Sequence, residues 1–249
     1  MSRAVQIILS YVSRLSWFPK TPCDSAMLPR VLEPEVMDSP SEAADYDAMD
    51  HAEVNRVFVA DLLAAGLPDG PILDLGAGTA LIPIELARRC DTVRLVAADA
   101  ARHMLHAAEA NVRRAGLSGR ITLQCVDAKR LPYADASFAT VMSNSLVHHV
   151  ADPWPVLAEA WRVLTPGGLL FFRDLARPAD DRAVARVVDT YAAGANAHQR
   201  RMLEDSLRAA LTVEEMASLI AKLGAGPGTL TLTSDRHWTW MARKSEPRP

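Results

Sequence analysis

Three aspartates each end a short run of strand-forming residues: Asp74, Asp99 and Asp127. Two glycines, Gly76 and Gly78, follow the first of them, and glycines at such a turn let a ligand come close to the backbone. A carboxylate here would repel a phosphate group, which prefers bare amides or a lysine. The pattern therefore favours a ligand that carries an ammonium group.

The other two acids extend this candidate site. The spacing from Gly76 to Asp99 is close to the roughly 20 residues expected for an acid that binds a ribose diol. Asp127 could accept a hydrogen bond from an adenine amino group, and Ala128 offers its backbone amide to a ring nitrogen. One adenosine and one charged amino-acid tail, as in S-adenosylmethionine, would account for all three acids.

Strands and helices alternate along the chain in the way needed to bring these acids together. Strand-like runs lie at 71–74, 92–98, 121–126, 138–143 and 169–173. Helical segments follow the first, second and fourth runs, and the last of these helices begins at Asp152-Pro153 and ends in a turn at 165–168. In an open parallel sheet, ligands bind at the carboxyl ends of the strands, near the point where the strand order reverses. We therefore predict an α/β fold with a Rossmann-like, doubly wound, seven-stranded sheet, mostly parallel with a C-terminal antiparallel hairpin at 229–233 and 237–242.

Other segments surround this sheet. Residues 178–211 look helical and lack a strand-like run, so we interpret them as a helical cap insertion. A capping box at 212–215, with Gly224 as a stop, predicts the last helix. We interpret residues 1–32 as an N-terminal extension and residues 33–249 as a single domain, in which the acidic stretch 33–50 is expected to be a solvated loop or a short helix.

The ordered set of motifs resembles the class I S-adenosylmethionine-dependent methyltransferases, and the small-molecule group related to quinone-biosynthesis methyltransferases is nearest in pattern. The resemblance covers roughly residues 45–242. It rests on Leu73-Asp74-Leu75-Gly76-Ala77-Gly78-Thr79-Ala80, on Val96-Ala97-Ala98-Asp99-Ala100 with Met104, on Val126-Asp127-Ala128, on Ser143-Asn144-Ser145-Leu146-Val147-His148-His149 and on Arg162-Val163-Leu164-Thr165-Pro166-Gly167-Gly168. Each motif alone is weak, and the ordered set is specific.

The resemblance implies which residues hold the methyl donor. Gly76, Ala77 and Gly78 would wrap its methionine part, and Asp74 would contact its ammonium. Asp99 would hold the ribose, Met104 would lie against the adenine, and Tyr46 would lie over the donor. The matching motifs add Ala100, Asp127, Ala128 and Asn144 to this set. The implied activity is methyl transfer to an oxygen, sulfur or nitrogen nucleophile of a small molecule by in-line displacement, in which alignment supplies much of the rate.

Residues for the methyl acceptor are less specific. His148 and His149 follow the fourth strand, and either could be a general base, a substrate hydrogen-bonding group or a structural donor, with His149 preferred as the base. Further substrate candidates are Met49, Ser145, Arg173 and Asp174. Arg173 and Asp174 could equally form a local ion pair, and Tyr46 and Met49 could pack on the domain instead of a ligand.

Three other functions are compatible with parts of the pattern. A nicotinamide dehydrogenase would want glycine at the position of Leu81 and no acid at Asp74. A tRNA or other nucleic-acid methyltransferase would want a basic surface and an Asn-Pro-Pro-aromatic run, where residues 144–147 are Asn-Ser-Leu-Val. The intact set of three strand-end acids argues against a donor-binding subunit without activity.

Composition sets outer limits on the function. A net charge of −3 and an isoelectric point near 6.2 give no nucleic-acid footprint. The longest apolar runs are far shorter than the roughly 20 residues of a membrane helix, so no stable membrane insertion is expected. Cys23, Cys90 and Cys125 form neither a disulfide framework nor a metal-ligand cluster, so we expect a cytoplasmic protein without a metal site, with Cys125 in the core. No feature of the sequence specifies an oligomeric state.

Overall fold

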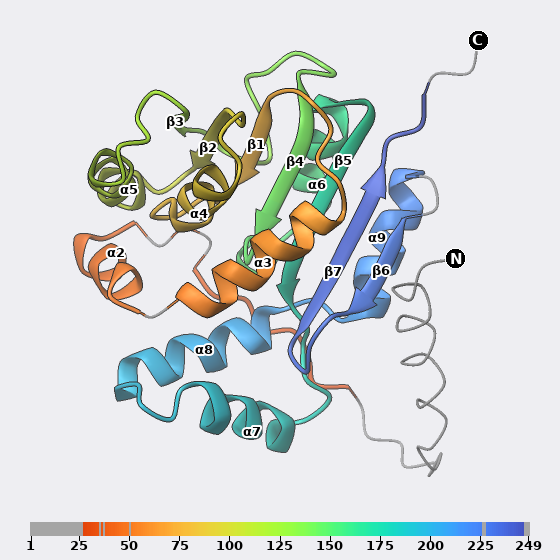
Figure 1. The fold of residues 1–249 in the computed structure, drawn as a ribbon. Coiled ribbons are helices and arrows are strands. Elements are labelled where there is room, and N and C mark those ends of the chain that lie inside the picture. Colours follow the sequence, from red (N-terminus) through yellow and green to blue (C-terminus); the bar gives the residue numbers. More distant parts are fainter. Residues whose placement is uncertain (1–26, 35, 37, 50, 226–227, 247–249) are drawn as a thin grey trace, which may run out of the picture.

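A computed structural model describes residues 27–34, 36, 38–49, 51–225 and 228–246, and Figure 1 shows the fold. Seven strands form one sheet in the order β3-β2-β1-β4-β5-β7-β6. β7 is antiparallel to β5 and β6, and the other neighbouring strands are parallel. The predicted Rossmann-like sheet with an antiparallel hairpin at its end is confirmed.

The strand order reverses between β1 and β4, which lie side by side at the centre of the sheet. All four residues of β1 are buried, as expected for a strand covered on both faces. The strands are β1 (Ile72–Leu75), β2 (Leu95–Asp99), β3 (Ile121–Cys125), β4 (Phe138–Asn144), β5 (Leu164–Leu175), β6 (Thr229–Leu232) and β7 (His237–Arg243).

Helices cover both faces of the sheet and the carboxyl ends of its central strands. They are α2 (Pro40–Asp47), α3 (Ala52–Ala64), α4 (Leu81–Arg89), α5 (Arg102–Arg114), the 3-10 helix η2 (Val147–His149), α6 (Trp154–Val163), α7 (Asp181–Tyr191), α8 (Ala197–Ala209) and α9 (Val213–Leu223). One face packs on α3, α4 and α5 through Phe58, Leu86 and Ala108. The other packs on α6 and α9 through Leu157 and Met216.

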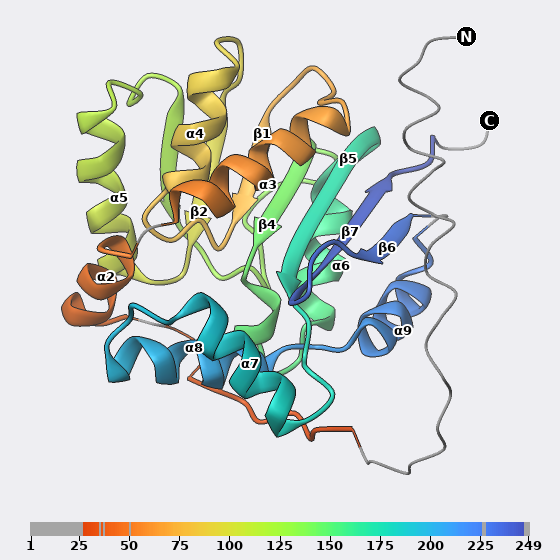
Figure 2. The ribbon, with the colours of Figure 1, turned by 60° about the horizontal axis from the view of Figure 1, so that its bottom comes forward.

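The helices α7 and α8 lie across the carboxyl ends of β4 and β5 (Figure 2). Local sequence explains where they begin. Asp180 caps α7 by accepting a hydrogen bond from the Ala183 amide, and Asn196 forms a capping box with Gln199 at the start of α8. The predicted capping box of the last helix is also confirmed, because Thr212 and Glu215 cap α9 reciprocally.

A strap, defined here as residues 27–34, runs along these helices and joins them to the sheet domain (Figure 2). The Leu28 amide donates to the Ala179 carbonyl at 3.3 Å, and the Val31 amide donates to the Arg208 carbonyl at 3.1 Å. The part of the predicted N-terminal extension that is described, residues 27–32, therefore packs on the domain. Residues 1–26 lie outside the described residues.

Two predicted boundaries differ from the structure. β5 begins at Leu164, so the glycines expected to form a turn at 165–168 lie within a long irregular strand instead. The positive φ of Gly167 (73°) and a register shift between Phe138 and Thr140 show that these glycines make a bulge rather than a break. α6 starts at Trp154, one residue later than the Asp152-Pro153 signal, although Asp152 still accepts a hydrogen bond from the Trp154 amide at 3.1 Å.

The prediction that Cys125 belongs to the core is wrong. Cys125 ends β3, which is an edge strand of the sheet, and its side chain is exposed. An apolar alternation fixes which residues share a face of a strand, but it does not show that both faces are covered. Among the helices of the described chain, none is long and apolar enough to cross a membrane.

Candidate functional site

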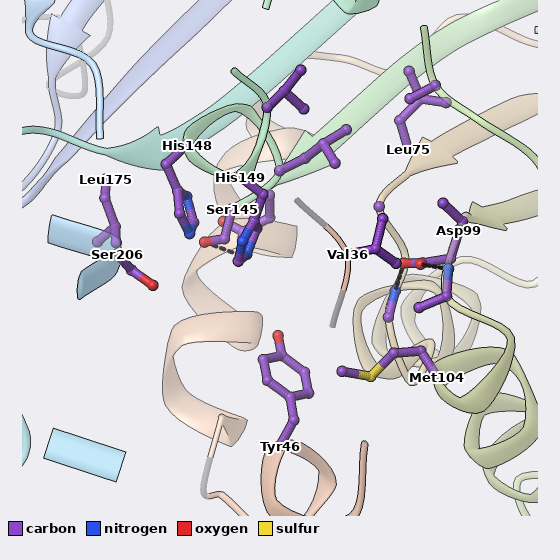
Figure 3. Close-up of a pocket in the computed structure, with 18 of the residues that line it drawn as sticks. Val36, Tyr46, Leu75, Asp99, Met104, Ser145, His148, His149, Leu175 and Ser206 are labelled. Atoms are coloured by element: carbon purple, nitrogen blue, oxygen red, sulfur yellow. Dashed lines mark hydrogen bonds between the residues drawn. The ribbon is translucent and has the colours of Figure 1, made fainter. Parts of the chain in front are cut away.

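A cavity of about 420 Å³ opens at the carboxyl ends of β1, β2 and β4. We define two regions at its ends. The glycine-turn side is residues 74–78 with Asp99, and the histidine side is His148, His149 and Ser206 with the adjoining Glu33. Figure 3 shows Asp99 and Met104 at one end, His148 and His149 at the other, and Tyr46 between them.

Most of the predicted site residues line this cavity. They are Tyr46, Met49, Gly76, Gly78, Asp99, Ala100, Met104, Asp127, Ala128, Asn144, Ser145, His148 and His149. Asp74 and Ala77 line a small adjoining recess together with Tyr46, Gly76 and Asn144. The three strand-end acids therefore lie along one connected surface, as the parallel sheet requires.

The turn after β1 uses its glycines for both conformation and space. Gly76 and Gly78 have φ angles of 72° and 53°, a region that side-chain-bearing residues seldom occupy. A Cβ on Gly76 would come within 3.0 Å of Leu146, and one on Gly78 would face Tyr46 at 3.7 Å. The bare backbone of this turn is thus part of the cavity wall.

Asp99 stabilises the glycine turn after β1 through hydrogen bonds. Its carboxylate accepts hydrogen bonds from the Gly78 amide at 2.7 Å and from the Ala101 amide at 2.8 Å. Burial raises the pKa of Asp99 in spite of these bonds. The backbone hydrogen bonds of Asp99 therefore do not fully compensate for the burial of its ionised carboxylate.

Asp74 is in a similar environment and is only 2% exposed. Burial, and then the neighbouring Asp99 charge, raise the pKa of Asp74 well above its usual range. Burial together with the charges of Asp99 and Asp74 also raises the pKa of Tyr46 to about 12. A positively charged ligand in this recess would relieve the repulsion between the two carboxylates.

Asn144 and Ser145 lie between the two sides of the cavity. Asn144 lines both the cavity and the recess, and its Oδ1 atom is buried without a hydrogen-bond partner among the described residues. Ser145 has a positive φ of 59°, and non-glycine residues in that region tend to occur at functional sites. An unpaired buried acceptor, two buried acids and a glycine cradle fit a ligand with ammonium and hydroxyl donors.

On the histidine side, three titratable groups converge. Oε1 of Glu33 lies 2.9 Å from Nδ1 of His149 and 3.5 Å from Nε2 of His148. Glu33 comes from the strap and also accepts hydrogen bonds from the Ser206 hydroxyl of α8 at 3.2 and 3.3 Å. The expectation that residues 33–50 are a solvated stretch therefore fails at Glu33, whose side chain is 13% exposed.

His148 is anchored from the sheet. Its Nδ1 lies 2.5 Å from Oδ1 of Asp174, whose carboxylate also accepts hydrogen bonds from the Val147 and Leu175 amides. Burial on its own would lower the pKa of His148, but the carboxylates of Asp174 and Glu33 outweigh it and raise that pKa. Asp174 thus acts on the cavity through His148 and does not line the cavity itself.

Arg173 is not brought to the cavity. Its guanidinium lies 2.6 Å from Asp61 of α3 and donates to the Thr239 hydroxyl at 2.9 Å, on the opposite face of the sheet from His148. Neighbouring residues of a strand point to opposite faces, so Arg173 and Asp174 pair with different partners and not with each other.

Several cavity residues carry no signal in the sequence. Gln199, Met202, Leu203 and Ser206 come from α8, Arg236 and His237 come from the hairpin, and Val36, His51 and Asn55 come from the segment before β1. Helical periodicity could place the α8 residues on one face of their helix. The sequence does not show that this helix face covers the carboxyl ends of the strands. Glu33 looks like any other acid in an acidic stretch.

Comparison with known proteins agrees with this architecture. Residues 73–172 match the model of a methyltransferase domain family. A demethylmenaquinone methyltransferase of Deinococcus radiodurans is 37% identical over 144 residues, which cover 56% of this chain and 59% of the relative. A 27-O-demethylrifamycin SV methyltransferase of Amycolatopsis mediterranei is 34% identical over 117 residues, which cover 46% and 43%. This chain thus spans 59% of the first relative's length and 43% of the second's.

A solved structure extends the likeness in fold to most of the chain. A S-adenosylmethionine-dependent methyltransferase from Aquifex aeolicus superposes with a TM-score of 0.62 at 17% identity, over 82% of this chain and 97% of the other. The fold is therefore that of the class I methyltransferases. The match of residues 73–172 to a methyltransferase domain family, and relatives that are named methyltransferases, agree with the resemblance that the motifs predicted.

Proposed function

We propose that this protein transfers a methyl group from S-adenosylmethionine to a small-molecule acceptor with an oxygen, sulfur or nitrogen nucleophile. The observation that carries the proposal is the meeting of Asp74, Asp99 and Asp127 with the glycine turn at one end of a cavity that continues to His149. When bound, the donor supplies an already activated methyl group, so the protein has to bind, align and exclude water.

The glycine-turn side would hold the donor. Asp74 would bind its ammonium, because a cation relieves the repulsion that raises the pKa of this buried acid. Asp99 would accept hydrogen bonds from the ribose hydroxyls with the lone pairs left by the Gly78 and Ala101 amides. Met104 and the exposed Asp127 would flank the adenine, and Asn144 would accept a donor hydrogen bond at its unpaired Oδ1.

The histidine side would hold the acceptor. α7 and α8 would act as its cap, since Met202 and Leu203 of α8 face the cavity with Val36 and offer apolar contact. His149 would take a proton from an acceptor hydroxyl, thiol or ammonium, and Glu33, at 2.9 Å, would stabilise the imidazolium that forms. The cytoplasmic location inferred from the cysteines is part of the same proposal.

Calorimetric titration with S-adenosylmethionine tests the donor site. Asp99→Asn keeps the side-chain volume and removes a buried charge, so the fold should persist. Losing a hydrogen bond to a charged group costs about 1.5–3 kcal/mol, so we expect donor affinity to fall roughly 10- to 100-fold. Asp91→Asn makes the same chemical change at an exposed site before β2 and should leave affinity unchanged. Equal affinity in the wild type and Asp99→Asn would refute the donor site.

The acceptor is found by assay. Thiols, phenols, amines and carboxylates are incubated with labelled donor, and methylated products are counted. The names of the two curated relatives give different acceptors, a demethylmenaquinone and a 27-O-demethylrifamycin, so the screen includes both compounds. Product with at least one class, and a lower turnover number in His149→Ala at unchanged donor affinity, are the expected results.

A further inference from the structure

The histidine side holds a ligand set that its sequence did not suggest. Glu33 Oε1, His148 Nε2 and His149 Nδ1 all lie within 4.8 Å of one another. Oε1 is 2.9 Å from the His149 nitrogen and 3.5 Å from the His148 nitrogen. Metal bonds of about 2.0–2.1 Å in tetrahedral geometry would place ligand atoms roughly 3.3 Å apart, and both Glu33 distances are close to that spacing.

The groups behind this set are those that support metal ligands. A metal-binding histidine usually donates its other ring N–H to a carboxylate, which fixes the tautomer and the ring orientation. His148 meets that description, because Asp174 accepts from its Nδ1 at 2.5 Å and is itself held by two backbone amides. The remaining nitrogen of His148, Nε2, is thereby directed to Glu33.

The surroundings of Glu33 and His149 also suit metal ligands. Glu33 receives hydrogen bonds from the Ser206 hydroxyl, as ligating carboxylates commonly do. Nδ1 of His149 is buried, and in spite of its short distance to Glu33 it has no hydrogen bond of acceptable direction among the described residues. A buried nitrogen that lies close to a carboxylate without a hydrogen bond to it is suited to share an ion with that carboxylate.

We infer that Glu33, His148 and His149 bind a divalent transition-metal ion, with Zn²⁺ as the best match. Two imidazoles and one carboxylate are the donor set of catalytic zinc sites, which keep one further position for water or substrate. His148 and His149 line the cavity, so that position is available to a small molecule. Where the methyl-transfer proposal also holds, the ion lowers the pKa of a bound acceptor hydroxyl or thiol in place of the His149 base.

The site is tested by binding alone, without donor or acceptor. The full chain, free of any polyhistidine tag and stripped with a chelator, is titrated with ZnCl₂ by calorimetry, and the zinc is then recovered by competition with a chromogenic chelator. We expect one ion per chain. Glu33→Gln and His149→Gln should each weaken affinity at least tenfold, and Asp174→Asn should weaken it roughly 10- to 100-fold through His148.

A matched control removes another histidine next to a carboxylate. His103 lies 2.9 Å from Asp38 in an exposed pair, so His103→Gln should bind zinc as the wild type does. A zinc-dependent rise in melting temperature that is lost in Glu33→Gln and kept in His103→Gln separates site binding from misfolding. Absence of stoichiometric zinc in the wild type, or equal affinity in all variants, overturns the inference. Donor titration with chelator present stays unaffected in either case and tests the methyltransferase proposal separately.

Discussion

The two sides of the cavity are built in different ways. On the glycine-turn side, the contacts join segments that are close in sequence or adjacent in the sheet: Asp99 of β2 binds the Gly78 amide beside it. The histidine side is assembled from four distant pieces: the strap, η2, the end of β5 and α8. The comparison shows that the sheet alone builds the proposed donor side, while the proposed acceptor side depends on how peripheral segments pack.

The largest effect should come from filling the turn itself. Gly76→Ala places a side chain at φ 72°, which costs about 1–2 kcal/mol, and brings its Cβ within 3.0 Å of Leu146. Overpacking of this kind adds about 1–3 kcal/mol, and the turn can relieve both costs only by moving from its position in the cavity wall, so we expect donor affinity to fall on the order of 100-fold in calorimetric titration.

Gly116 offers the matched control. Its φ of 71° is the same, but nothing lies within 4 Å of the position of a Cβ, and it follows α5 away from the cavity. Gly116→Ala should therefore lower the free energy of unfolding by about 1–2 kcal/mol and leave donor affinity intact. If both alanine variants bind the donor equally well, the turn does not form the donor site.

A smaller effect, on stability and hydrogen exchange, is expected from a substitution that loosens only the histidine side. Arg30 of the strap donates to the carbonyls of Ala209 at 2.6 Å, Val150 at 2.9 Å and Ala151 at 3.1 Å, so it ties α8 and η2 to the segment that carries Glu33. Arg30→Ala leaves these carbonyls without their charged donor, which should cost about 1–3 kcal/mol of stability. Hydrogen exchange should then speed up in the strap and in η2 but not in β1.

Arg94 serves as the comparison for that variant, since it donates to one exposed carbonyl, that of Gly119, at 3.1 Å. Arg94→Ala should leave exchange in the strap unchanged. Faster exchange in β1 than in the strap of Arg30→Ala would mean that the two sides are not separately built.

The difference between the two sides of the cavity also explains which site residues the sequence could predict. The acids of β1 and β2 and the glycines between them form a local pattern, because a parallel sheet brings successive strand ends to one edge. Asp174 and Arg173 show the limit: strand alternation sends one toward His148 and the other toward Asp61, and the sequence does not say which face meets the cavity. Glu33 could not be found, because its place depends on the path of the strap across α8.

The smallest expected effect is a dependence of donor affinity on pH, caused by the protonation of Asp74 on the glycine-turn side. In the free protein, burial and the Asp99 charge raise the pKa of Asp74, so the folded state binds this proton more tightly than the unfolded chain does. Asp74 therefore reduces stability as the pH rises from its usual range to the raised pKa, and contributes no further change above it. A bound ammonium favours the ionised form, so donor affinity should be highest above the raised pKa and should fall as the pH drops through it.

One proton limits that slope to about tenfold per pH unit. Calorimetry over a pH series, in buffers of different ionisation enthalpy, measures both the slope and the proton released on binding. Asp74→Asn has no proton to lose there, so its weaker affinity should vary less with pH, while Asp91→Asn should reproduce the wild-type slope. If Asp74→Asn keeps the wild-type proton release, the proton belongs to another group such as Asp99, whose pKa burial also raises, and the ammonium contact of Asp74 is refuted.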